Sequence, residues 1–88
     1  MEYELYVIYD AAKEYYNQPM CATNDADAMR TFAHEAMKSD SLVNSHPSDF
    51  ILYHVGTFYA LTGEIISCKP ERVCAGNDFV KPKTKRSK

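Results

Sequence analysis

Hydrophobic and polar side chains alternate along residues 3–9, and this period of two predicts a β-strand. One side of it carries Tyr3, Leu5, Val7 and Tyr9, and the other carries Glu4, Tyr6 and Ile8. Because the second side is not fully polar, the strand should be central in a sheet or covered on both faces. A turn over 10–13 follows, then a short return strand over 18–22. Pro19 has no N–H to donate, so it should lie at that strand's start or on an edge.

Helical periodicity replaces the alternation over residues 24–38. Asn24 can cap the first free amides, and Asp27 three residues later completes a capping-box-like pair. The apolar positions repeat at helical spacing and form one stripe, made of Ala26, Met29, Phe32, Ala33, Ala36 and Met37. We expect this helix to pack across one face of a sheet.

The second half of the chain reads as a hairpin. A polar connection over 39–49, interrupted by Pro47, leads to the strongest strand pattern, residues 50–59. Gly56 inside that strand predicts a bulge or a close backbone approach. Gly63 allows a tight reversal, after which residues 64–69 should return antiparallel. Beyond Pro70, residues 73–80 could form an irregular segment or one more short edge strand.

These elements predict an α+β fold, in which an antiparallel sheet of three to five strands carries one helix on one face, in the order strand–strand–helix–strand–strand. Residues 1–80 should form this single domain, and 81–88 a basic flexible tail. Residues 1–80 hold 5 basic and 12 acidic side chains, a net charge of −7, whereas 81–88 carry +5. Lys81, Lys83, Lys85, Arg86 and Lys88 make up the basic end.

Other features of the sequence indicate the cellular compartment and argue against metal, cofactor and phosphate-binding sites. The acidic start, the absence of a membrane-length apolar run and an odd number of cysteines favour a reduced, cytoplasmic protein. Cys68 and Cys74 lack the spacing of a zinc knuckle and the histidines are scattered, so no metal or cofactor is expected. Burial among apolar side chains is a better explanation for Cys21 and Cys68 than metal binding. With three glycines there is no phosphate-binding fingerprint.

We therefore expect a binding protein and not an enzyme. A hydrolytic site built on His46 and Asp49 is a weaker alternative, since those residues more plausibly form a turn. Closely spaced lysines neutralise phosphates, and exposed aromatic rings stack on bases. The tail, or a local patch near Lys13, Lys69 and Arg72, is the expected phosphate contact. The aromatic candidates for stacking are Tyr3, Tyr6, Tyr15, Tyr16, Tyr53, Phe58 and Tyr59, with Tyr6 and Phe58 preferred. The alternative for these rings is the core and the interface of a homodimer, which we also expect.

Several stretches resemble a known family. Residues 6–10 (YVIYD) with 18–20 (QPM), 24–32 (NDADAMRTF), 46–53 (HPSDFILY), 55–59 (VGTFY) and Thr62-Gly63 are similar to the small nonstructural protein of gokushovirus-type microviruses, over about residues 3–70. The resemblance implies a DNA-binding phage protein, made in the host bacterial cytoplasm and absent from the virion, which assists the switch to single-stranded genome synthesis or packaging. It implies no catalytic residues.

Two functions therefore remain open. The first is a dimeric, sequence-tolerant single-stranded DNA-binding protein that assists phage genome replication. The second is an adaptor that engages a viral or host replication protein without binding DNA, through a sheet edge or the acidic body. The acidic surface favours the second, because it should repel DNA.

Overall fold

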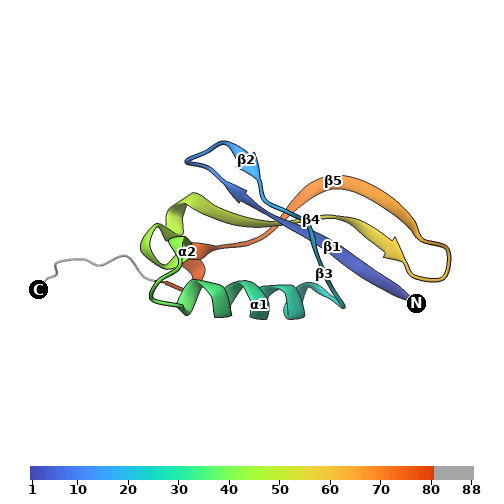
Figure 1. Ribbon diagram of the computed structural model, residues 1–88, viewed down its shortest axis with the longest axis horizontal. Coiled ribbons are helices and arrows are strands. Elements are labelled where there is room, and N and C mark those ends of the chain that lie inside the picture. Colours follow the sequence, from blue (N-terminus) through green and yellow to red (C-terminus); the bar gives the residue numbers. More distant parts are fainter. Residues whose placement is uncertain (81–88) are drawn as a thin grey trace, which may run out of the picture.

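The computed structural model describes residues 1–80, and the predicted tail over 81–88 lies outside the described residues (Figure 1). It has the expected α+β fold. The strands are β1 (Glu2–Asp10), β2 (Tyr15–Tyr16), β3 (Met20–Ala22), β4 (Phe50–Tyr59) and β5 (Glu64–Ala75). The helices are α1 (Asp25–Met37) and α2 (Leu42–Ser45), with short 3-10 turns at Pro47–Asp49 and Gly76–Asp78.

The sheet has five antiparallel strands in the order β2-β1-β4-β5, and β3 also pairs with β1. β1 is thus central, as its two apolar sides suggested. Figure 1 shows α1 running along one face of the sheet, while β2 and β5 curl away from it. We call the face toward α1 the covered face and the opposite face the open face.

Helix α1 begins where the capping signal placed it. Asn24 accepts a hydrogen bond from the Asp27 backbone N–H at 2.9 Å, while the Asp27 carboxylate lies 3.6 Å from Arg30. The buried stripe is Ala28, Phe32 and Ala36, four residues apart. Two positions assigned to the stripe from the sequence, Ala26 and Met37, are exposed because the helix contacts the sheet along a narrower line.

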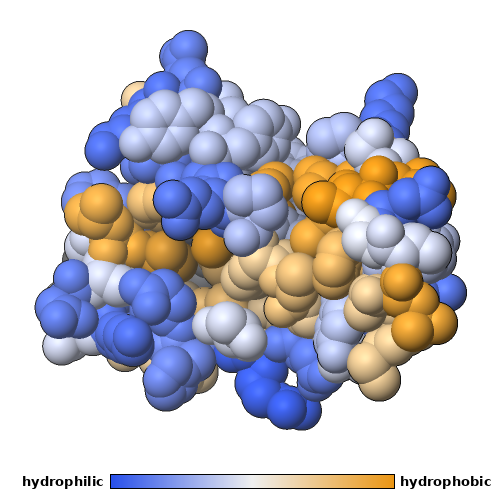
Figure 2. Space-filling model, turned by 45° about the vertical axis from the view of Figure 1, so that its right-hand side comes forward, coloured by the Kyte–Doolittle hydropathy of each residue, from blue (hydrophilic) through white to orange (hydrophobic). Residues whose placement is uncertain are grey.

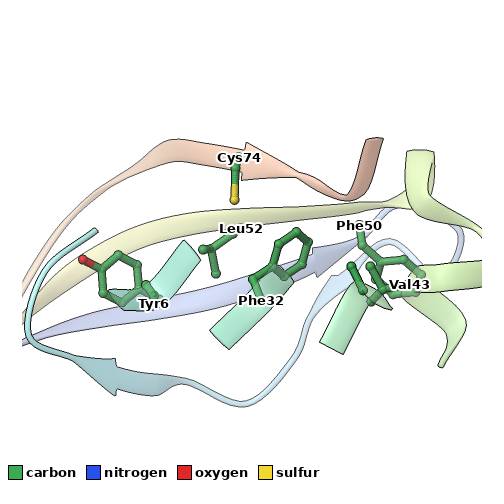
Figure 3. Close-up of a cluster of buried hydrophobic side chains, with 8 residues drawn as sticks. Tyr6, Phe32, Val43, Phe50, Leu52 and Cys74 are labelled. Carbon is green, nitrogen blue, oxygen red and sulfur yellow. The ribbon is translucent and has the colours of Figure 1, made fainter. Parts of the chain in front are cut away.

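The core lies between α1 and the covered face (Figure 3). Phe32 reaches from the helix toward Leu52 of β4, and Tyr6 and Cys74 flank them from β1 and β5. Val43 and Phe50 close the end near α2. Burial raises the pKa of the Cys74 thiol to about 11, because the thiolate would be poorly solvated there.

Some expectations were wrong in detail. β5 continues through Pro70 to Ala75, because the chain bulges there and a proline is tolerated at an edge strand. The connection over 39–49 contains α2 and a 3-10 turn, and β2 was not foreseen. Cys21 and Cys68 are exposed, and the buried cysteine is Cys74, because only Cys74 lies under α1.

Candidate nucleic-acid interface

Strand periodicity sorts the sheet's side chains onto two chemically different faces. Tyr6 and Ile8 pack in the core, so the alternate β1 residues Tyr3, Leu5, Val7 and Tyr9 belong to the open face. Cross-strand pairing extends this assignment to the other strands, because directly opposed residues share a face. The open face thereby also receives Ile51, Tyr53, Phe58, Ile65 and Arg72.

Three tyrosines gather at one end of the open face, and we call them the tyrosine cluster. Tyr9 and Tyr16 are cross-strand partners with ring centroids 4.8 Å apart. The Tyr16 ring meets Tyr53 edge-on at 6.0 Å. Arg72 is the partner of Tyr53 in β5, so a guanidinium stands beside the cluster, 3.8 Å from the Asp78 carboxylate. Tyr16 is exposed and the other two rings are half-buried. Such partly exposed rings beside a cation can stack on bases and hold a phosphate.

A second, more apolar region continues the open face toward the β4–β5 hairpin. Tyr3, Phe58 and Ile65 form one cross-strand row, in which Phe58 is half-buried. Figure 2 shows apolar surface gathered on the side of the molecule that carries the N-terminus and this hairpin. The large exposed hydrophobic side chains at this end of the molecule are Met1, Leu61, Ile65 and Ile66, of which Ile66 belongs to the covered face through its pairing with Thr57.

The acidic side chains of the strands all belong to the covered face. Glu2 and Glu4 share the alternation of Tyr6, and Asp10 does as well. Glu64 joins them through the row Glu2–Tyr59–Glu64, and Glu71 through the row Tyr6–His54–Glu71. The negative charge of the domain is therefore not spread evenly, and no strand residue of the described chain places a carboxylate on the open face.

Tyr6 was expected to be an exposed base-stacking residue, and this was wrong. Its side chain is fully buried, and its hydroxyl donates a 2.6 Å hydrogen bond to the Asp25 carboxylate. Burial raises the pKa of the Tyr6 hydroxyl, and the hydrogen bond to Asp25 adds to this rise. Tyr6 belongs to the covered face because it lies one residue out of phase with Leu5 and Val7.

The remaining predicted contacts are dispersed. Lys69 is exposed in the bulged part of β5, and Phe58 lies farther along the open face than Arg72. Tyr15 belongs to the opposite side from Tyr16, where it lines an open groove of about 660 Å³ between β2 and α1. The basic residues of 81–88 lie outside the described residues. Tyr9 was missing from the stacking residues predicted from the sequence, although its alternation with Tyr3 placed it on the same face.

His46 and Asp49 form a turn, as expected. The Asp49 backbone N–H donates to the His46 carbonyl at 3.0 Å, and the His46 ring contacts the Ser45 hydroxyl at 2.8 Å. Both interactions are local, so the residues close the connection into β4.

Neither α1 nor α2 has the length and apolar character that a bilayer-spanning helix requires, within the part of the chain that the structure describes.

Comparison with known proteins identifies the family. No curated protein and no solved structure matches the chain. Residues 3–79 match the family described as Phage ORF5 protein, and they include both helices and, apart from Glu2, all the strand residues of the described chain. Since this match spans most of the chain, the protein is a bacteriophage protein that belongs to the Phage ORF5 protein family.

Proposed function

We propose that the protein is a nonstructural single-stranded DNA-binding protein of a gokushovirus-type microvirus. It acts in the host bacterial cytoplasm, outside the virion, and assists genome replication at the switch to single-stranded synthesis or at packaging. Binding is sequence-tolerant and needs no cofactor or catalytic group. Membership of a phage family supports this setting.

The open face is the observation that carries the proposal. Bases stack on the tyrosine cluster, and Arg72 beside Tyr53 contacts a phosphate. Lys69 and the basic residues of 81–88 add sequence-independent phosphate contacts. The acidic strand residues do not oppose this, because they belong to the covered face and a strand bound over the tyrosine cluster avoids them.

Fluorescence anisotropy of labelled single- and double-stranded oligonucleotides, over a salt series, tests the proposal. We expect tighter binding to the single strand, weakening with salt. Tyr16→Ala should lower that affinity at least fivefold, since a stacked base contributes about 1–3 kcal/mol. Tyr15→Ala is the matched control, because both tyrosines are 50% exposed and lie on opposite sides of β2. Equal effects of the two substitutions would contradict the assignment of the open face.

Two further variants separate the phosphate contacts. Each contact to a single strand changes the slope of log affinity against log salt by about 0.7. Arg72→Gln should therefore reduce the slope by about that amount, and deletion of 81–88 by about 3.5 if all five basic residues bind. An unchanged slope after the deletion would leave the folded body as the binding surface.

The adaptor function has one observation in its favour, the apolar hairpin end with Met1, Leu61, Ile65 and Ile66. A viral or host replication protein could cover it, and so could a second copy in the homodimer that we also propose. Absence of DNA binding even at low salt, together with one stoichiometric protein partner, would favour the adaptor. Sedimentation of the protein with and without Leu61→Lys tests the homodimer, which the substitution should weaken.

A further inference from the structure

An irregular stretch of the β4–β5 hairpin brings three ligand-type side chains together on the covered face. His54 pairs with Glu71 and Gly56 with Ser67, so the single residue Val55 lies opposite three residues of β5. The pairing of β1 with β4 also skips Val55, between Leu5 and Tyr6. In a regular strand, side chains three positions apart belong to opposite faces. The bulge lets both Cys68 and Glu71 reach His54.

Glycine at position 56 makes this bulge feasible. A Cβ atom there would lie 2.6 Å from the Ile66 carbonyl oxygen and 3.1 Å from the Ser67 Cα. Such a close approach of two backbones excludes any larger residue without a shift of β5. The sequence signal of an isolated strand glycine is confirmed, and its consequence is the convergence at His54.

The distances within this group are also compatible with a shared metal ion. His54 Nδ1 lies 3.6 Å from Cys68 Sγ and 3.4 Å from Glu71 Oε1, and the three ligand atoms all lie within 4.8 Å of one another. A nitrogen–oxygen hydrogen bond prefers 2.7–3.2 Å. In a tetrahedral zinc site with ordinary bond lengths, the separations are about 3.6 Å for sulfur to nitrogen and about 3.3 Å for nitrogen to oxygen.

The other side of the imidazole is already oriented for metal binding. His54 Nε2 donates to Glu4 Oε1 at 2.7 Å, and the Thr57 hydroxyl donates to the same oxygen at 3.1 Å. A proton held on Nε2 leaves the Nδ1 lone pair for a metal. A carboxylate behind a histidine ligand is the usual outer-shell partner in zinc sites, where it fixes the ring and raises its basicity.

The local charge favours a cation as well. Glu4 and Glu71 both contact the His54 ring, whose side chain is only 19% exposed. The two carboxylates make the surroundings of the His54 ring negative, and this charge would stabilise a divalent cation bound between Nδ1 and the Glu71 carboxylate.

From this geometry we propose a zinc site formed by His54 Nδ1, Cys68 Sγ and a Glu71 carboxylate oxygen, with Glu4 as the outer-shell partner and the fourth position open to water. Sulfur, imidazole and carboxylate together select Zn²⁺ among common divalent ions. Binding displaces the proton of the Cys68 thiol. The ion would fasten the bulge and join β4 to β5, independently of any DNA on the open face.

Titration of the purified full chain with Co²⁺, a coloured substitute for Zn²⁺, tests the site. We expect the visible absorption of tetrahedral Co²⁺ and a thiolate-to-cobalt charge-transfer band, both saturating at one equivalent and both lost when Zn²⁺ is added. Cys68→Ser should abolish the charge-transfer band. Cys21→Ser should leave it unchanged, because Cys21 is also exposed but lies on β3, away from His54.

Two carboxylate variants test the ligand and the outer shell separately. Glu71→Gln should weaken Zn²⁺ at least tenfold in competition with a chromophoric chelator, and Glu4→Gln by 10- to 100-fold. Glu64→Gln, on the same strand and the same face, is the matched control. A cobalt spectrum without the charge-transfer band, a band that survives Cys68→Ser, or equal affinities for all three carboxylate variants would overturn the proposal.

Discussion

The covered and open faces of one sheet differ in almost every respect, although the same strands supply both. The covered face holds the largest buried side chains and all the strand carboxylates. The open face holds tyrosines at one end and an apolar row at the other. The difference shows that net charge is a poor guide to what a small β-rich domain can bind. Strand periodicity can place all the carboxylates of the strands on one side of a sheet.

The largest difference between the faces should be in stability. Phe32→Ala removes a ring that is 1% exposed and should lower the free energy of unfolding by about 3–5 kcal/mol. Phe58→Ala, on the half-buried open face, should cost roughly 1–2 kcal/mol. Urea denaturation of both variants measures this. A larger loss for Phe58 would mean that the open face is covered in solution, for example by a second copy.

Thiol reactivity should next separate the part of the covered face that lies under α1, which holds Cys74, from the exposed parts of the sheet, which hold Cys21 and Cys68. At pH 8, a pKa of about 11 leaves Cys74 with about a hundredfold less thiolate than an ordinary thiol, and burial slows its reaction further. A chromogenic disulfide reagent in chelator-containing buffer should therefore label two cysteines quickly and Cys74 slowly. Fast labelling of all three cysteines would show that α1 opens readily.

The same raised pKa makes stability depend on pH. The unfolded chain releases the Cys74 proton near pH 8.5, whereas the folded chain keeps it to about pH 11. Stability from this group is complete below pH 8.5 and falls as the pH rises toward 11. Urea titrations across this range should show the decline, and Cys74→Ala should remove this contribution to the slope.

The bulge at Gly56 should be the next most sensitive position. Gly56→Ala forces a contact with the Ile66 carbonyl and should cost about 1–3 kcal/mol. Gly63→Ala places a methyl group in open space at a φ of +79°, so only backbone strain of about 1 kcal/mol is expected. Thermal denaturation compares the two. Only Gly56→Ala should also weaken Co²⁺ binding, because it disturbs the bulge.

The smallest expected effect concerns Tyr6, which was predicted to be exposed and is buried. Tyr6→Phe keeps the ring in the core and removes the hydrogen bond to Asp25, which is exposed and can be solvated instead. We expect a loss of about 1 kcal/mol by urea denaturation, and no change in DNA affinity. A loss of DNA affinity without a loss of stability would instead indicate that Tyr6 contacts DNA.

The fold was predictable where local signals agreed. The alternation over 3–9, the Asn24 cap and the Gly63 reversal each correspond to an observed element. The burial of Tyr6 was not predictable, because both sides of that strand carry aromatic and branched residues. Only the contact with α1 decides which side is buried.

The candidate sites were harder to predict than the fold. Tyr9, Tyr16 and Tyr53 come from three strands, and only the register brings them together. Cys68 and Glu71 are three residues apart on a strand, a spacing that predicts opposite faces, so the cluster around His54 depends on the bulge. An isolated strand glycine signals such a bulge, but not which side chains it gathers.

The bulge also affects how the protein behaves at high concentration. β5 is the last strand of the sheet in the described chain, and an unpaired outer edge of 12 residues is a template on which other chains can add strands. Pro70 lacks an N–H and Lys69 adds a charge. The irregular pairing with β4 bends β5 at these two residues. The edge is thereby divided into two short segments, which makes it a poor template for strand addition by another chain.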